Sequence, residues 1–194
     1  MAAPLYFTLL RVFLVPLFPL FYLFYERLGI SLSLVPYILI LILLLCEFTD
    51  LFDGFIARKL NKVTDLGKIL DPTADSVTRL TVLFTFSQGV IQLPLLLVLV
   101  FLFREFMIST LRTICALKGF ALAARKSGKL KAVILASISF LILLLMIPYT
   151  MGYLSLESLR LISLISVSLA AVYTVFTAVD YFYANRSYIK KAIY

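Results

Sequence analysis

Long apolar runs, separated by short polar or charged stretches, follow one another along almost the whole chain. Six of them can be delimited, at about residues 8–25, 34–55, 69–86, 93–115, 131–149 and 159–182. Each run is close to the roughly 20 residues that a helix needs to cross the apolar part of a bilayer. The pattern predicts an all-α fold with six transmembrane helices, in a polytopic membrane protein that forms a single domain over residues 1–194.

Composition favours a membrane protein over a soluble one. The chain is 63% hydrophobic and only 14% charged, with a mean hydropathy of +1.08, whereas soluble domains are nearer half apolar and a quarter charged. The first apolar run contains Arg11 and is not followed by a small-residue cleavage site and a polar mature domain. A cleaved signal peptide is therefore not expected.

Few residues of the kinds that bind transition metals are present. The chain has no His and two Cys, Cys46 and Cys115, each within an apolar run. The absence of His excludes His-based zinc sites and a His general base. We expect both Cys side chains to be buried as small hydrophobic groups rather than joined in a disulfide.

The distribution of basic residues predicts the orientation in the membrane. The net charge is +8. Most of the bases lie in two connections and the C-terminal tail: Arg58, Lys59, Lys62, Lys68, Lys118, Arg125, Lys126, Lys129, Lys131, Arg186, Lys190 and Lys191. The alternate loops carry only Arg27 and Arg160. Both termini are therefore expected on the cytoplasmic side of a cytoplasmic (inner) membrane, with anionic lipid headgroups and phosphate substrates as partners rather than nucleic acid.

Four aspartates, Asp50, Asp53, Asp71 and Asp75, lie where the second and third apolar runs meet. On a helix, residues three apart are separated by about 60° and residues four apart by about 40°, so each pair shares a face. A polar turn between the two helices lets them return antiparallel, and the two faces can then converge. The sequence therefore predicts a polar active-site cavity that faces the cytoplasm.

Four carboxylates around a small volume repel one another, and hard divalent cations relieve that repulsion. Ligation by oxygen alone favours Mg²⁺ or Mn²⁺ over zinc. Two such ions can bridge a phosphate and stabilise the attacking and leaving oxygens. Gly54 and Ala57 leave room for a ligand beside the aspartates, Gly67 permits close helix approach, and Arg58 is placed to reach phosphate oxygens.

Asp71 has a second interpretation, because Asp71-Pro72 resembles a helix N-cap followed by Pro at the first helical position. We favour a metal ligand, because residues 67–70 continue the helical apolar pattern backwards and bring Asp71 level with Asp53. A further alternative is that the aspartates are ordinary interfacial charges that pair with Lys and Arg.

The spacing of these residues resembles a family signature. The pattern D-x-x-D-G-x-x-A-R, eight residues, G-x-x-x-D-x-x-x-D is matched at every fixed position by Asp50, Asp53, Gly54, Ala57, Arg58, Gly67, Asp71 and Asp75. It resembles the signature of the CDP-alcohol phosphotransferase family, whose six-helix layout also fits. Residues 63–75, 104–112 and 127–131 resemble the phosphatidylglycerophosphate synthase subfamily. Residues 3–7 depart from that subfamily, as does Ser76, where Lys is common.

The resemblance implies a reaction in which CDP-diacylglycerol and sn-glycerol 3-phosphate give phosphatidylglycerophosphate and CMP. It implies that Asp75 is the catalytic general base and that the protein is a homodimer. The four aspartates would hold two divalent cations, Mg²⁺ or Mn²⁺. The pocket for the cytidine diphosphate would be formed by Asp50, Gly54, Ala57, Arg58 and Gly67.

An acceptor that carries a phosphate needs a basic pocket separate from the metals. Arg112 lies inside the fourth apolar run, where an unpaired charge is costly. We expect Arg112 and Lys129 to contact the acceptor phosphate, with Arg104 and Ser127 in support, although Arg104 has Glu105 as a neighbouring carboxylate. We interpret Arg125, Lys126 and Lys131 as topology signals that meet lipid headgroups.

The remaining charged residues near the cluster keep two interpretations. Arg79, one turn after Asp75, pairs with it or with a phosphate. Glu47, one turn before Asp50, tunes the site or pairs with Arg11. Asp180 is expected to pair with a base near the end of the sixth helix.

Other functions remain open at this point. The same chemistry could serve another acceptor, such as inositol phosphate, serine or a lipid alcohol. A cation transporter would spread its acids toward the middle of the bilayer, whereas these cluster near one face. A structural membrane protein would tolerate Asp75→Asn, whereas the enzyme would lose its turnover.

Overall fold

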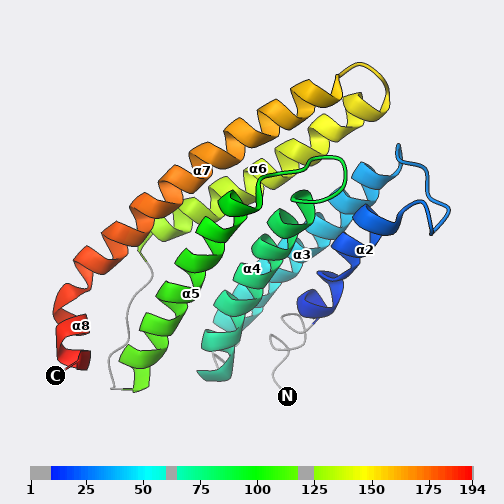
Figure 1. The fold of residues 1–194 in the computed structure, drawn as a ribbon. Helices are drawn as coiled ribbons and strands as arrows, with labels where there is room; N and C mark the ends of the chain where they lie inside the picture. Colours follow the sequence, from blue (N-terminus) through cyan, green and yellow to red (C-terminus); the bar gives the residue numbers. More distant parts are fainter. Residues whose placement is uncertain (1–9, 60–64, 118–124, 194) are drawn as a thin grey trace.

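The computed structural model describes residues 10–59, 65–117 and 125–193, and the side chains among them except those at 50–59, 65–72, 116 and 190–193. All regular secondary structure in this part of the chain is α-helical (Figure 1). A helical stretch at residues 10–14 leads into the labelled helices, which are α2 (Leu17–Phe24), α3 (Val35–Lys59), α4 (Asp65–Phe86), α5 (Leu95–Leu117), α6 (Lys126–Thr150), α7 (Leu156–Ala184) and α8 (Arg186–Ile193).

The six apolar runs therefore correspond to helices, and the predicted all-α class is confirmed over the described residues. The bounds differ most where charged residues belong to a helix: α4 begins at Asp65 and α6 at Lys126, ahead of the first apolar residues. The helix α8 was not predicted, because its sequence RSYIKKAI contains no apolar run.

By length and composition, α6 and α7 are long and apolar enough to cross a membrane, and Leu10–Phe24 and Val35–Thr49 are shorter apolar stretches. The apolar part of α3 ends at Thr49, just before Asp50. The helix α5 carries Arg104, Glu105 and Arg112 along its length. In α6 and α7 the charged residues lie near the helix ends and the middle of each helix is apolar. The number of spans remains a prediction.

The connections lie at two ends of an elongated bundle (Figure 1). Residues 25–34, 87–94 and 151–155 form one end, and α8, the last turns of α3 and α5, and the first turns of α4 and α6 lie at the other. The helix ends that flank the predicted basic connections thus share one end with α8, whereas residues 60–64 and 118–124, with Lys62 and Lys118, lie outside the described residues. Which side of the membrane this end faces remains a prediction.

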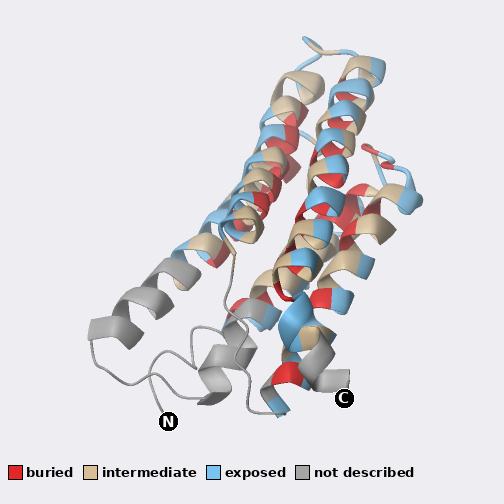
Figure 2. Ribbon diagram, turned by 90° about the vertical axis from the view of Figure 1, so that its left-hand side faces the viewer, coloured by how far each residue is buried: buried red, intermediate tan, exposed pale blue. Residues whose placement is uncertain are grey.

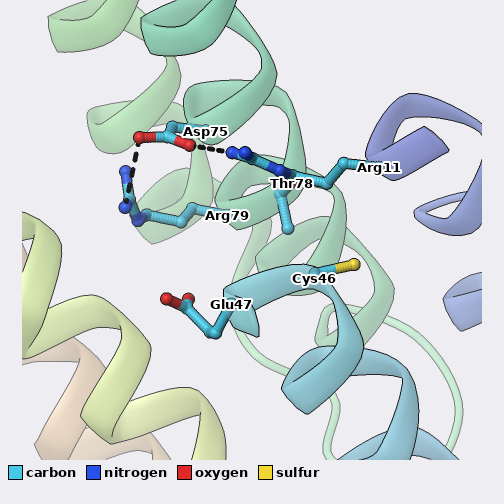
Figure 3. Close-up of a pocket in the computed structure, with 6 residues that line it drawn as sticks. All are labelled: Arg11, Cys46, Glu47, Asp75, Thr78 and Arg79. Carbon is cyan, nitrogen blue, oxygen red and sulfur yellow. Dashed lines mark hydrogen bonds and ion pairs between the residues drawn. The ribbon is translucent and has the colours of Figure 1, made fainter. Parts of the chain in front are cut away.

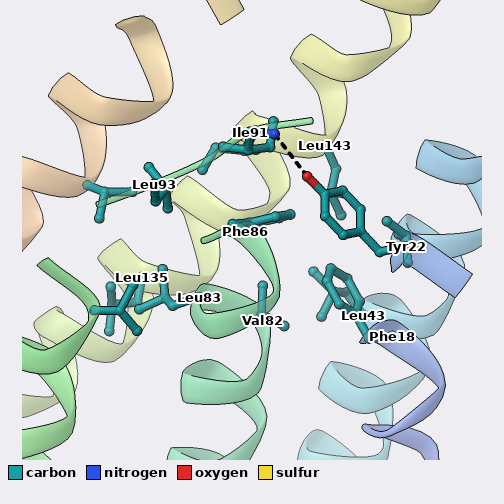
Figure 4. Packing of buried hydrophobic residues seen from close by; sticks show 14 of the residues in the cluster. Phe18, Tyr22, Leu43, Val82, Leu83, Phe86, Ile91, Leu93, Leu135 and Leu143 are labelled. Atoms are coloured by element: carbon teal, nitrogen blue, oxygen red, sulfur yellow. Dashed lines mark hydrogen bonds between the residues drawn. The ribbon is translucent and has the colours of Figure 1, made fainter. Parts of the chain in front are cut away.

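Aromatic side chains from α2 and α4 form the centre of the core near the less charged end (Figure 4). Phe86 has no exposed surface and packs edge-on against Phe18 and Tyr22, with ring centroids 5.8 and 5.9 Å apart. The outer faces of the helices are largely exposed (Figure 2). On α7 they carry apolar side chains such as Leu169 and Val172, 68% and 71% exposed. Large exposed apolar surface is what a helix in contact with lipid presents.

The turn after α4 depends on a glycine. Gly89 has φ +63°, and a Cβ there would lie 2.8 Å from Cε1 of Tyr22. The Tyr22 hydroxyl accepts a hydrogen bond from the Ile91 N–H at 3.0 Å and donates to the Gln88 carbonyl at 3.3 Å. The glycine therefore lets the turn close over the tyrosine ring.

We expect Gly89→Ala to destabilise the protein by about 1–3 kcal/mol for the left-handed backbone alone, with a further loss from overlap with Tyr22. Thermal unfolding in detergent measures the change. Gly29→Ala is a matched control, because Gly29 has φ +69° and nothing within 4 Å of its added Cβ. Equal losses in the two variants would show that the tyrosine contact contributes nothing.

Candidate active site

A small pocket lies where the start of the described chain meets α3 and α4. It is lined by Arg11, by Cys46 and Glu47 of α3, and by Asp75, Thr78 and Arg79 of α4 (Figure 3). Cys46 is buried and free, as predicted, and so is Cys115. The pocket thus brings together side chains of α3 that lie one turn before Asp50 and side chains of α4 at and just after Asp75.

The backbone register places the predicted aspartates beyond this pocket. Asp50 and Asp53 lie about one and two turns after Glu47 on α3, and Asp71 lies one turn before Asp75 on α4. Because the two helices run in opposite directions (Figure 1), these four positions fall at similar levels along the bundle. Both pairs are on helices, so each pair shares a face.

Several predicted site residues lie outside the described side chains: Asp50, Asp53, Gly54, Ala57, Arg58, Gly67 and Asp71. Their backbone is helical, and the convergence of the carboxylates remains a prediction. The described side chains by themselves hold no group of three or more His, Cys, Asp or Glu that could bind a metal. Asp50, Asp53 and Asp71, the other predicted ligands, are not among the side chains searched.

The N-cap interpretation of Asp71 is wrong. The helix α4 begins at Asp65, so Asp71 lies more than a turn inside it, and Pro72 is also within the helix. A capping residue precedes the first helical turn and satisfies the N–H groups that have no intrahelical partner there. Asp71 has no such groups to cap.

Asp75 is held by two arginines (Figure 3). Arg11 donates from Nη1 to Oδ1 of Asp75, and Nη2 of Arg79 lies 3.8 Å from Oδ2. The Arg11 side chain is only 2% exposed, whereas that of Asp75 is 26% exposed. Of the two interpretations of Arg79, the structure contains the pair with Asp75. Arg11 thereby joins the start of the chain to α4.

A second polar cluster is centred on Glu105 of α5. Its Oε1 accepts from Nη1 of Arg104 at 2.9 Å and from Nζ of Lys131, and its Oε2 accepts from the Ser76 hydroxyl at 2.9 Å. Arg104 thus pairs with Glu105, the neighbouring carboxylate that the sequence offered as an alternative partner. The interpretation of Lys131 as a surface topology signal is wrong, because its side chain is only 5% exposed and is paired inside the bundle.

A third cluster joins the start of α6 to the end of α7. Asp180 accepts two hydrogen bonds from Arg125, at 2.9 and 3.0 Å, and one from the Ser127 hydroxyl at 2.6 Å. The predicted pairing of Asp180 with a base is therefore confirmed. Arg112 donates from Nε to the Tyr181 hydroxyl at 3.1 Å, and its guanidinium carbon lies 5.4 Å from the centre of that ring.

Of the four residues predicted to bind the acceptor phosphate, three lie near one another. Arg104 interacts electrostatically with Arg112, and its Nη2 lies 3.4 Å from the point where a Cβ on Gly128 would be. Ser127 precedes that glycine, so three of the four residues gather around the start of α6. Lys129 is exposed.

From the sequence, Glu105 was considered only as a neighbour of Arg104. Its hydrogen bonds with Lys131 and Ser76 were not predicted. A signal was present for Glu105, because an acid inside an apolar run marks a functional or paired site. No sequence pattern indicates that Ser76 and Lys131 approach the same carboxylate, since they lie 29 and 26 residues from it.

Comparison with known proteins identifies the family. A sequence model of the CDP-alcohol phosphatidyltransferase family matches residues 1–179. Over 187 residues, the chain is 34% identical to a Rickettsia typhi protein named CDP-diacylglycerol–glycerol-3-phosphate 3-phosphatidyltransferase, with 95% of this chain and 97% of the relative covered. A Bacillus subtilis protein of the same name is 35% identical over 133 residues, or 64% of this chain and 67% of that one. The chain therefore belongs to the CDP-alcohol phosphatidyltransferase family and is a membrane-associated enzyme of phospholipid biosynthesis.

Proposed function

We propose that the protein transfers the phosphatidyl group of CDP-diacylglycerol to sn-glycerol 3-phosphate, giving phosphatidylglycerophosphate and CMP. The observation that carries this choice of acceptor is a series of cations that begins at Arg79, the partner of Asp75. Lys131 interacts electrostatically with both Arg79 and Arg104, and Arg104 with Arg112. Such a series suits an acceptor that brings its own phosphate. The names of the relatives support the same reaction.

In this proposal Asp50, Asp53, Asp71 and Asp75 hold two divalent cations, Mg²⁺ or Mn²⁺. The donor set fits, because it consists of carboxylates on two helices that both contribute side chains to one pocket. When bound, such ions neutralise charge on the diphosphate and on the departing CMP. Asp50, Gly54, Ala57, Arg58 and Gly67 are proposed to surround the cytidine diphosphate.

Asp75 is proposed as the general base. It would accept the proton of the acceptor hydroxyl as that oxygen bonds to the phosphorus of the phosphatidyl group, while the bond from this phosphorus to the CMP oxygen breaks and CMP leaves with the electron pair. A positioned base of this kind contributes about 10²–10⁴-fold to a rate. Arg11 and Arg79 keep the Asp75 carboxylate at the edge of the pocket.

The acceptor phosphate is proposed to bind Arg112 and Lys129, with Arg104 and Ser127 in support. The Nε of Arg104 is buried and has no partner among the described residues. That N–H can therefore donate a hydrogen bond to an anion without breaking an existing one. Ser127 donates a hydrogen bond to Asp180. This bond fixes the first turn of α6, where Gly128 lies against Arg104.

Three broader proposals follow from the charge distribution and the family. The basic end of the bundle faces the cytoplasm, so that both termini and the active site lie on that side of a cytoplasmic (inner) membrane. The lipid tails of the donor then stay in the bilayer while polar partners arrive from the cytoplasm. The whole chain, residues 1–194, acts as one domain, and two copies form a homodimer.

The decisive experiment offers the purified protein labelled CDP-diacylglycerol, Mg²⁺ or Mn²⁺, and a panel of acceptors. The panel contains sn-glycerol 3-phosphate, inositol phosphate, serine and a lipid alcohol. We expect release of CMP with sn-glycerol 3-phosphate and formation of phosphatidylglycerophosphate. Release with serine or a lipid alcohol alone would overturn the choice of acceptor, and no release with any acceptor from folded protein would overturn the enzymatic proposal.

We expect Arg112→Ala to raise KM for sn-glycerol 3-phosphate by about tenfold to a hundredfold, the usual cost of losing a charge-assisted hydrogen bond. The KM for CDP-diacylglycerol should change much less. Arg186→Ala is a matched control, because Arg186 also stacks on a tyrosine near the end of α7, with 4.3 Å from its guanidinium carbon to the ring centre of Tyr183, but is exposed. Equal effects of the two variants on the acceptor KM would contradict the proposed pocket.

A further inference from the structure

The carboxylate of Glu105 joins three helices at one point inside the bundle. It lies on α5 and accepts hydrogen bonds from Ser76 of α4, from its neighbour Arg104 and from Lys131 of α6. The side chains of Glu105, Arg104 and Lys131 are 18%, 10% and 5% exposed. A carboxylate so placed is more than a surface charge, because each of its oxygens has a partner from a different part of the fold.

Without Glu105, the positive charges around it would repel one another at low solvent exposure. Lys131 interacts electrostatically with Arg79 and Arg104, and Arg104 in turn with Arg112. A carboxylate between them stabilises Lys131 and Arg104 in charged form, since burial without a partner is costly for both. Glu105 is the group that accepts from both.

The contact with Glu105 also sets the orientation of the Arg104 guanidinium. Its Nη1 is tied to Glu105 at 2.9 Å, and its Nη2 lies against Gly128, where a Cβ would be 3.4 Å away. Its Nε remains buried without a partner among the described residues. Because a guanidinium is planar, fixing one edge determines where the remaining N–H groups point.

Ser76 connects this arrangement to the reaction centre. It follows Asp75 directly in α4, and its hydroxyl donates to the second oxygen of Glu105 at 2.9 Å. The same carboxylate therefore contacts the residue next to the proposed base and the arginine proposed for the acceptor phosphate. A fixed separation between these two groups is what an acceptor with a hydroxyl and a phosphate at its two ends requires.

We propose that Glu105 is a positioning residue for the acceptor: through Arg104, Lys131 and Ser76 it holds the phosphate-binding cations at a set place relative to Asp75. The inference rests on the proposed function and assigns Glu105 no contact with the substrate. It predicts a role in selecting a small phosphorylated alcohol, because orientation rather than net charge determines the fit.

Glu105→Gln, which keeps the size of the side chain and removes its charge, tests this role. We expect KM for sn-glycerol 3-phosphate to rise by about tenfold or more, with a much smaller change in kcat and in KM for CDP-diacylglycerol. If Glu105 merely lowered the net positive charge, its removal would tighten acceptor binding and lower that KM. An unchanged or lower acceptor KM would overturn the proposal. Glu157→Gln, an exposed Glu in the first turn of α7, is the matched control.

Ser76→Ala keeps the test informative if Glu105→Gln folds poorly, and a double variant extends the test if Glu105→Gln folds. Ser76→Ala removes only the bond to Oε2 and should raise the acceptor KM in the same direction by a smaller factor. The double variant Lys131→Gln with Glu105→Gln should raise the acceptor KM by less than the two single effects combined. The reason is that Lys131 and Glu105 form one pair, which either single change already breaks. An unchanged acceptor KM in Ser76→Ala would overturn the proposal, and so would simple additivity of the Glu105→Gln and Lys131→Gln effects.

The outcome also separates this inference from the proposed function. If the wild-type protein releases CMP with sn-glycerol 3-phosphate and Glu105→Gln leaves the acceptor KM unchanged, only the inference fails. If the wild type does not use that acceptor, the proposed function fails, and stabilisation by inorganic phosphate in a thermal unfolding assay then tests Glu105. A smaller stabilisation in Glu105→Gln than in the wild type would support the positioning role, and an equal one would overturn it.

Discussion

Asp75→Asn is expected to lower turnover by about 10²–10⁴-fold or more, because it removes the proposed base and one carboxylate of the proposed metal site together. Asn has nearly the same shape as Asp but does not take up a proton at neutral pH. The release of CMP per folded molecule measures the effect. Turnover near the wild-type level would rule out Asp75 as the base.

The contact with Arg11 adds a second expectation for the same variant. Arg11 is almost fully buried, and removing one partner of a buried ion pair costs up to about 3–5 kcal/mol. The loss should be smaller here, because the Asn oxygen can still accept a hydrogen bond and Asp75 is partly exposed. Thermal unfolding of the variant separates lost stability from lost chemistry.

Asp180→Asn serves as the control for Asp75→Asn. Asp180 also pairs with an arginine, through two hydrogen bonds from Arg125, but it lies at the end of α7 and outside the pocket around Asp75. We expect it to lower stability by a similar or smaller amount and to reduce turnover far less. Equal losses of turnover would indicate that both aspartates act only through folding.

Removal of divalent cations is the other change with a large expected effect. We expect a chelator to lower CMP release by about 10³-fold or more, because the ions would supply several kcal/mol of charge stabilisation. Added Mg²⁺ or Mn²⁺ should restore activity. Full turnover in protein freed of divalent cations would contradict the two-metal proposal.

A binding measurement makes the metal prediction independent of activity. Mn²⁺ should raise the unfolding temperature of the wild-type protein, because a ligand that binds only the folded state stabilises it. Asp50→Asn and Asp71→Asn should each reduce this shift. Asp180→Asn, whose carboxylate is paired with Arg125 elsewhere, should keep it. Shifts of equal size in all three variants would place the ion at another site.

The helices were predictable because local patterns specify them. A run of about 20 apolar residues is helical in a bilayer whatever lies around it, since its backbone groups must bond within the segment. Helix ends were less predictable: charged residues at Asp65 and Lys126 belong to helices although they interrupt the apolar pattern. Because α4 begins at Asp65, Asp71 lies inside the helix, which rules out the N-cap interpretation that the sequence left open.

The spacing of the four aspartates, the family signature and the gathering of bases in alternate connections can all be read along the chain, because each depends on residues near one another in sequence. The partners of Asp75 and Glu105 could not be read in that way. Arg11 reaches Asp75 across 64 residues and Lys131 reaches Glu105 across 26. Which cation meets which carboxylate depends on how the helices pack side by side, and a pattern within a single helix contains no information about that packing.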